Sequence, residues 1–447
     1  MVHDETGNQI SSTTEGCKAY DAGLRSLLSM RSTVAADIQF AVDTDPASPL
    51  AAILSAYLGL LSSERCDARV AVKQLALIDS SGRSLNPREM MHLRATRQLS
   101  AGDLYGASDT TLEISRHYPR DALALFAGHQ IDFFTGAANR LEARIAAALP
   151  HWNQEDRAIG YLEGMWSFGL EELGRYEAAL DVGHRAVIRN SDDAWAIHAV
   201  AHVHEMRGDY DIGVDWLTTM RSDWQIGTFM NVHIAWHNAL FLLETEDWGG
   251  VLALYDSFIH NDSSSNLALQ MLDASSLLWR LRLDGVDTGD RWQALADGWL
   301  SKQDEPWYSF NDMHAVMAFV SDERTSTAHE VIRRLETYVN EPGDNSNREM
   351  ARRVGLPVCR AIFHHAQGDY AAAADILAPV LPALSTFGGS HAQRDVVHRT
   401  FIDALMRSNR RDLAEQILVN RLVERPRSRW SQKRLATIQK ADGNLSR

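Results

Sequence analysis

The chain has 447 residues, of which 45% are hydrophobic and 23% are charged, as in an ordinary globular protein. Its 44 lysines and arginines against 59 aspartates and glutamates give a formal charge of −15, which argues against a nucleic-acid partner because phosphate binding needs a basic surface. Three cysteines are too few for a disulfide framework. The sequence also has no run of about 18 apolar residues, which is the length that a membrane-spanning helix needs. The sequence therefore predicts a cytoplasmic protein with no nucleic-acid and no membrane partner.

Helical periodicity covers most of the chain, and one short turn pattern returns along it. GRYEAALDV begins at Gly174 and GDYDIGVDWL begins at Gly208, a spacing of 34 residues, which is the period of a tetratricopeptide repeat. The same turn returns at Glu246 and Gly368 and, more loosely, at Gly102. Such helix pairs bury their apolar faces only by stacking on neighbours. We expect an all-α chain in which residues 1–447 form one superhelix of stacked antiparallel helix pairs that could curl around a central pocket.

The first candidate side chains lie on two successive inner helices. Tyr161 opens YLEGMWSFGLEE, and the next inner helix, DDAWAIHAVAHVHEM, carries four polar or aromatic groups in groove register: Trp195, His198, His202 and Glu205. The two histidines and the glutamate are spaced i, i+4, i+7, so they project within about 60° of one another on a helix. His204 points toward the packing interface instead.

The following inner helix, NVHIAWHNALFLLE, presents His233 and Trp236 to the same groove, with His237 at its edge. Histidines converging from two helices, with aromatic walls, suit a small polar ligand. The alternative is that these histidines have no ligand and are either solvated or hydrogen-bonded to neighbouring helices. A pair of His-x3-His spacings also suits zinc, but the sequence has no HExxH and no clear carboxylate ligand set. We therefore expect no metal cofactor, with less than one zinc ion per chain.

Two basic or capped segments follow near the C-terminus. GGSHAQRDV contains Ser390 and Gln393 at capping-box spacing, so a helix should begin there, with His391, Arg394 and Asp395 on its first turn. Arg394 and the helix N-terminus could clamp an anion, and the alternative is a plain cap with an Arg–Asp pair on the surface. The segment RLVERPRSRWSQKR (421–434) is expected to be a solvated helix face rather than an anion site.

An ordered set of segments resembles the tetratricopeptide repeat protein 38 family. These are YLEGMWSFGLEE, DDAWAIHAVAHVHEM, HIAWH, LDASSLLWRLRLDGVDTGDRW, FNDMHAVMAF, ARRVGLPVC and GGSHAQRDV. The resemblance implies a His-x3-His-x2-Glu pattern at His198, His202 and Glu205, and places Asp312 and His314 in a Phe-Asn-Asp-x-His pattern. The family's His-Asn-x-Trp-His pattern falls on His233, Trp236 and His237, with Ile234 in place of Asn. The resemblance implies architecture more than activity.

Two functions fit these residues. The first is an enzyme in which a small polar substrate is held by Arg394 and the tryptophan walls, while His202 with His233 or His237 does general acid–base work and Glu205 orients an imidazole. The alternative is a non-catalytic scaffold that binds a peptide or protein in its groove, and a homodimer is left open. Because groove side chains contribute little to packing, we expect His202→Ala and His233→Ala to leave stability nearly unchanged, and His204→Ala to lower it.

Overall fold

The computed structural model describes residues 2–80, 84–261, 263–302, 306–343 and 345–445. Two short strands, β1 (Val2–His3) and β2 (Gln9–Ile10), pair antiparallel, and an isolated bridge joins Arg31 to Thr228. The described part of the chain is otherwise built from helices and their connections. The prediction of an all-α chain is confirmed, apart from the two-residue hairpin at the N-terminus, which the repeat pattern does not predict.

The chain divides into two compact units. The first comprises Met1–Val200, Met220–Asn231 and Pro342–Glu349, and the second comprises Ala201–Thr219, Val232–Glu341 and Met350–Arg447. The helix α11 (Ala194–Arg207) contains the boundary between Val200 and Ala201, so this one helix contributes residues to both units. Each unit is therefore assembled from segments that are separated in the sequence.

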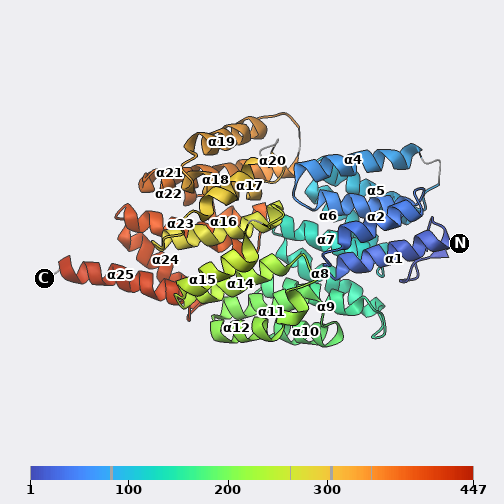
Figure 1. The fold of residues 1–447 in the computed structure, drawn as a ribbon, viewed down its shortest axis with the longest axis horizontal. Coiled ribbons are helices and arrows are strands. Elements are labelled where there is room, and N and C mark those ends of the chain that lie inside the picture. The colour runs from blue at the N-terminus through green and yellow to red at the C-terminus, as the bar shows by residue number, and fades with distance from the viewer. Residues whose placement is uncertain (1, 81–83, 262, 303–305, 344, 446–447) are drawn as a thin grey trace. The chain divides into compact units, whose positions relative to one another are not determined.

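Within each unit, consecutive helices pack on one another as repeat pairs, as the neighbouring coils of similar colour in Figure 1 show. The first unit contains α1 (Thr14–Leu28), α2 (Val34–Thr44), α3 (Pro49–Leu60), α4 (Arg65–Ser80), α5 (Pro87–Ser100), α6 (Leu104–His117), α7 (Ala122–Phe134), α8 (Ala138–Ala148), η1 (Leu149–His151), α9 (Ile159–Glu172), α10 (Tyr176–Arg189) and α13 (Arg221–Trp224). α20 (Ser346–Met350) begins in the first unit and ends in the second.

The second unit continues the helix pairs to the end of the described chain. It contains α12 (Tyr210–Thr219), α14 (Asn231–Glu244), α15 (Trp248–Leu254), η2 (Tyr255–Ile259), α16 (Ala268–Leu283), α17 (Arg291–Leu300), α18 (Ser309–Ser321), α19 (Thr325–Val339), η3 (Ala351–Gly355), α21 (Leu356–Ala366), α22 (Tyr370–Leu377), η4 (Leu381–Phe387), α23 (His391–Arg407), α24 (Arg411–Glu424) and α25 (Arg429–Leu445).

The predicted turns between paired helices adopt the left-handed backbone that favours glycine. The four glycines of the predicted turns have φ between 72° and 80°, and Glu246 takes the same conformation with φ 58°. Glu323 and Asn409 do so as well, with φ of 58° and 61°, in turns that a glycine pattern cannot detect. A small residue after the turn lets the helices approach: a Cβ atom on Gly213 would lie 2.5 Å from the Phe241 ring.

The core lies among the first helices of the pairs. Nearly every residue of α7, α16 and α18 is buried, whereas α10 and α19 bury one face only. This difference follows from stacking, since an inner helix is covered by neighbours on most sides and an outer helix faces solvent. No described helix is by itself both long and apolar enough to span a bilayer. The helices α22 and η4, which are bent by 72° relative to each other, together have the length and the apolar composition of a membrane span, and nothing else about them indicates one.

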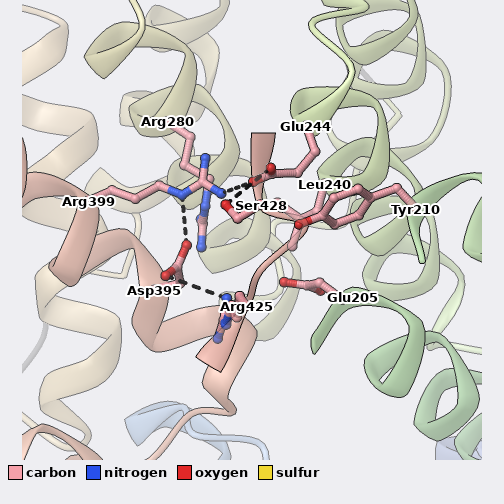
Figure 2. A pocket seen from close by; sticks show the side chains of 9 residues that line it. All are labelled: Glu205, Tyr210, Leu240, Glu244, Arg280, Asp395, Arg399, Arg425 and Ser428. Atoms are coloured by element: carbon pink, nitrogen blue, oxygen red, sulfur yellow. Dashed lines mark hydrogen bonds and ion pairs between the residues drawn. The ribbon is translucent and has the colours of Figure 1, made fainter. Parts of the chain in front are cut away.

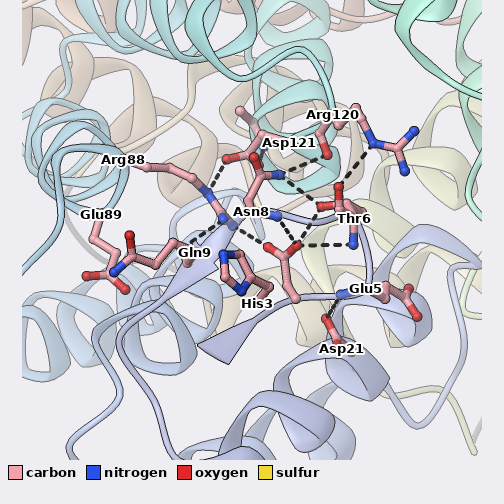
Figure 3. Close-up of polar contacts among 12 residues, drawn as sticks. His3, Glu5, Thr6, Asn8, Gln9, Asp21, Arg88, Glu89, Arg120 and Asp121 are labelled. Carbon is pink, nitrogen blue, oxygen red and sulfur yellow. Dashed lines mark hydrogen bonds and ion pairs between the residues drawn. The ribbon is translucent and has the colours of Figure 1, made fainter. Parts of the chain in front are cut away.

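A buried charge network ties the N-terminal hairpin to the helices α5 and α7 of the first unit (Figure 3). The guanidinium of Arg88 contacts Asp4 at 2.8 Å and Asp121 at 2.7 Å, and all three side chains are at most 3% exposed. Asp121 also accepts from the backbone N–H of Ala124 at 2.9 Å, which caps the N-terminus of α7. His92 adds a contact to the same carboxylate at 2.9 Å. The hairpin, α5 and α7 are thereby joined through one arginine.

Replacing Arg88 with methionine should lower the free energy of unfolding of the first unit by about 3–5 kcal/mol, because Asp4 and Asp121 would be buried without their counter-charge. Urea unfolding measures this loss. The matched control is Arg94→Met, since the Arg94–Glu113 pair is about half exposed and should cost about 1 kcal/mol or less. Equal effects of the two substitutions would contradict a stabilising role for the buried network.

Candidate functional site

Three imidazoles meet in the second unit, one from α11 and two from α14. The ring centroid of His237 lies 4.3 Å from that of His202 and 4.9 Å from that of His233. Each ring offers a nitrogen, and these nitrogens lie within 4.8 Å of one another. The i, i+4 spacing of His233 and His237 places both rings on one face of α14. We refer to His202, His233 and His237 as the histidine cluster.

Two members of the histidine cluster have a carboxyl group at Nδ1. Nδ1 of His233 contacts Asp273 Oδ2 of α16 at 2.8 Å, and Nδ1 of His237 contacts Glu205 Oε2 of α11 at 3.0 Å. An ionised carboxylate can only accept a hydrogen bond, so it holds the imidazole with its proton on Nδ1. When both carboxyls are ionised, the arrangement leaves Nε2 of each ring as the nitrogen with a lone pair.

The histidine cluster is inside the protein. His202 and His237 are fully buried, and the side chain of His233 is 17% exposed. Burial lowers the pKa of His202 and of His237 well below the ordinary value, and neighbouring imidazoles lower both further. Burial raises the pKa of Glu205 to about 7, against the opposing effect of Arg425 and Arg280.

The alternative that these histidines are solvated is therefore wrong for His202 and His237, and so is the expectation that their side chains contribute little to packing. A fully buried side chain leaves a cavity when it is truncated, so His202→Ala should lower stability rather than leave it unchanged. His204 is 7% exposed and also buried, so the contrast that the sequence analysis drew between His202 and His204 does not hold. The reason is that α11 is buried on all its faces, which helical periodicity alone does not reveal.

Trp236 forms one wall of the histidine cluster. Its ring stacks on His233 at 5.3 Å and meets His237 edge-on at 4.9 Å. Its indole Nε1 donates to Ser276 Oγ at 3.0 Å, and the guanidinium of Arg280 lies 5.4 Å from the ring centroid. Trp236 thus links the cluster to the charged residues of α16.

The first turn of α23 begins as the sequence predicts. Ser390 accepts from the backbone N–H of Gln393 at 3.3 Å, and Gln393 accepts from the backbone N–H of Ser390 at 3.1 Å, so the capping box is confirmed. His391 and Arg394 lie close enough to His202 to lower the pKa of that imidazole. Arg394 also donates to the carbonyl of Gly389.

Asp395 is not part of a surface pair, so that alternative is wrong. The residue is 3% exposed, and its carboxylate contacts Arg399 at 2.7 Å and Arg425 at 3.7 Å (Figure 2). It also contacts Arg421 at 2.7 Å. Burial by itself would raise the pKa of Asp395, but the three guanidinium groups hold it well below its usual range. Arg421 and Arg425 lie in the basic segment that was expected to be a solvated face, and their side chains are only 13% and 15% exposed.

The other predicted residues lie elsewhere. In the first unit, Trp195 packs on Phe168 and His198 at 5.1 and 5.2 Å, and the Tyr161 hydroxyl donates to Asp192 at 3.4 Å. His198 stacks on Phe168 at 5.6 Å.

In the second unit, burial raises the pKa of Asp312 to about 7, against the effect of Arg334. His314, on the same helix, donates from Nδ1 to the carbonyl of Phe310 at 2.8 Å. Neither of these two side chains has a contact with the histidine cluster among the described interactions.

The sequence analysis missed several residues of the site. These are Asp273, Arg280, Glu244, Arg399, Arg421 and Arg425. A signal existed for two of them: Asp273 and Arg280 interrupt an otherwise apolar helix at a spacing of seven residues, which places both on one face. Charged groups on a helix that is buried all round are costly unless paired, so they mark a functional or structural site.

Two sets of described residues could hold a metal ion within one unit. The histidine cluster supplies nitrogen ligands, and Glu64, Cys66 and Asp67 at the start of α4 supply a mixed, partly exposed set. Exposed acidic groups commonly lie together without an ion, so the second set is weak. No known family model matches this chain, and the resemblance to the tetratricopeptide repeat protein 38 family therefore stays a prediction.

The buried imidazole of His314 should make stability depend on pH. Burial lowers the pKa of His314 from 6.5 to about 3, so this contribution is complete above pH 6.5 and is lost as the pH falls toward 3. Between pH 7 and pH 5 the loss should be about 2 kcal/mol. Urea unfolding of the wild type and of His314→Gln at both pH values measures it. The variant, which cannot titrate, should lose less stability, and equal losses would show that His314 is not buried in its neutral form.

Proposed function

We propose that this chain is an enzyme that acts on a small polar molecule with the help of a divalent transition-metal ion held by His202, His233 and His237. The observation that carries the proposal is the convergence of three imidazole nitrogens within 4.8 Å, two of them on rings whose Nδ1 contacts a carboxyl group. Ligating histidines in metal sites characteristically have a carboxylate at the other ring nitrogen, which fixes the ring and raises its basicity.

The residues present fit the ion. Nitrogens bound to one tetrahedral zinc ion lie about 3.3 Å apart, so the cluster needs to contract by about 1.5 Å or less to bind it. A set of imidazoles favours zinc, copper, nickel or iron over the oxygen-seeking magnesium and calcium. Such an ion would polarise a carbonyl or lower the pKa of a bound water molecule. Asp273 and Glu205 would orient the ligands, and Trp236 would limit access of water.

This proposal replaces the expectation from the sequence that the protein binds less than one zinc ion per chain. That expectation came from the absence of an HExxH motif and of a carboxylate ligand set. The distant residue Asp273 supplies a carboxylate behind His233, and Glu205 supplies one behind His237. Both carboxyls support ligands instead of being ligands themselves, so a search for ligand motifs does not find them.

General acid–base catalysis by the same histidines, without a metal, is the second candidate. The observation that favours it is the carboxylate at Nδ1, which also holds catalytic imidazoles in their reactive tautomer. Since His202 and His237 are fully buried, the base in this candidate would be His233, whose side chain is 17% exposed. The peptide-binding scaffold is supported by the helical-repeat architecture alone, and these buried rings offer a peptide no surface.

Protein purified without chelator should carry about one transition-metal ion per chain, measured by elemental analysis. His233→Ala and His237→Ala should each reduce the bound metal to background, because each removes one of three ligands. Asp273→Asn should keep the site but weaken metal affinity by about 10–100-fold in a chelator competition. The matched control is His184→Ala, which removes an exposed histidine of α10.

Metal-free wild-type protein, or metal content unchanged in His233→Ala, would overturn the metal site and leave acid–base catalysis as the proposed function.

The proposal that the protein is an enzyme has its own test. Metal-loaded wild type should consume at least one member of a pool of small polar compounds followed by mass spectrometry, and His237→Ala should consume none. A metal-loaded protein that consumes nothing from a broad pool would favour the scaffold.

A further inference from the structure

Arg280 holds a buried positive charge close to the histidine cluster. The residue lies on α16 and is 1% exposed. Its Nη1 donates to the backbone carbonyl of Ser276 at 3.0 Å, and its Nη2 donates to that of Ala392 at 2.7 Å, so the guanidinium is fixed at two points. Burial lowers the pKa of Arg280 to about 10, and Arg399 lowers it as well, but the group is still charged at neutral pH.

Trp236 connects this guanidinium to two of the proposed metal ligands. The guanidinium carbon of Arg280 lies 5.4 Å from the ring centroid of Trp236. The same ring stacks on His233 at 5.3 Å and meets His237 edge-on at 4.9 Å. Asp273, which contacts His233, lies seven residues before Arg280 on one face of α16. One helix therefore places a carboxyl group against His233 and a positive charge against Trp236.

The charge of Arg280 already opposes positive charge on the histidine cluster. Burial and His233 lower the pKa of His237, and the guanidinium of Arg280 lowers it further. A proton and a metal ion both bring positive charge to an imidazole, so the guanidinium must oppose a bound metal ion as well. This repulsion is strong inside a protein because little water screens it.

Arg280 also lines a small polar cavity, which we call the charged cavity (Figure 2). Three arginines and three acidic residues line it, so the effect of Arg280 on the histidine cluster depends on its position and not on an excess of positive charge. The charged residues of the lining are Arg280, Arg399, Arg425, Glu205, Glu244 and Asp395.

We propose that Arg280 adjusts the reactivity of the metal site, because its fixed positive charge weakens binding of the ion and makes the bound ion more electron-poor; the inference rests on the proposed metal-dependent function. A positive charge near the ion favours loss of a proton from a metal-bound water molecule. It also raises the reduction potential of a redox-active ion, since reduction adds negative charge. Arg280 acts on the ligands through Trp236 and through its electric field, so it is a positioning residue and not a catalytic one.

The affinity for cobalt(II) tests this role in the full-length protein, by chelator competition followed through the visible absorption of the bound ion. Arg280→Gln removes the charge and keeps a donor for a backbone carbonyl. It should bind cobalt about tenfold more tightly than the wild type, because a repulsive charge is gone. Removal of a residue with a purely structural role would instead weaken binding, so the sign of the change separates the two roles.

Two further variants serve as controls for the cobalt measurement. Arg280→Lys keeps the charge and should bind cobalt as the wild type does. Arg282→Gln removes an arginine of the same helix, whose guanidinium carbon lies 5.6 Å from the ring centroid of Trp279. It should leave the affinity for cobalt unchanged.

The reduction potential of the copper-loaded protein gives a second readout. The potential of the Cu(II)/Cu(I) couple should be lower in Arg280→Gln than in the wild type, because loss of a positive charge favours the oxidised ion. Arg280→Lys and Arg282→Gln should keep the potential of the wild type.

Weaker or unchanged cobalt binding in Arg280→Gln, or an equal gain in Arg282→Gln, would overturn the role of Arg280. If Arg280→Gln does not fold, the two readouts in Arg280→Lys decide. Values equal to the wild type support the role of the charge, and weaker binding with an altered potential contradicts it. Wild-type protein that binds neither cobalt nor copper defeats the proposed function and this inference with it. Metal binding that does not respond to the charge at position 280 defeats this inference alone.

Discussion

The pairing of buried charges in the second unit is the constraint on which the site depends. Arg399 contacts Asp395 on its own helix and Glu244 on α14, both at 2.7 Å. Glu244 accepts in turn from the backbone N–H of Trp430 at 3.0 Å, which brings in the start of α25. Charges taken out of water must be matched where they lie, so these contacts fix the positions of α14, α23 and α25 more tightly than apolar packing would. The first turn of α23 is held next to His202 by the same contacts.

Two buried arginines, Arg88 in the first unit and Arg280 in the second, differ in their partners. Arg88 in the first unit has two carboxylates, and one of them also contacts His92, so the charges there are satisfied within the protein. Arg280 in the second unit has only carbonyl oxygens and an unused Nε. Buried polar groups are normally hydrogen-bonded, so the network at Arg88 supports the fold, and the Nε of Arg280 is an exception within the described residues.

The histidine cluster and the charged cavity form one arrangement rather than two. Glu205 contacts His237 and also lines the small cavity beside Arg280, Asp395 and Arg399, and Trp236 contacts both His233 and Arg280. The imidazoles of His233 and His237 are each held by a carboxyl group. Rigid support of this kind is what a reactive centre needs, because catalytic groups must be held in position before the substrate arrives.

The sequence by itself determined the helical class, the repeat turns and the capped start of α23, because these features depend on local chemistry: a left-handed turn residue, helical periodicity and a side chain that accepts from a nearby backbone N–H. It also placed His202, Glu205, His233 and His237 as candidates through spacing along two helices. Only the tertiary structure decided that these rings are buried, that Asp273 and Glu205 lie behind them, and that Arg421 and Arg425 surround Asp395 instead of facing solvent. The physical reason is that helical periodicity specifies the face of a helix on which a side chain lies, whereas burial and charge pairing depend on which distant helix covers that face.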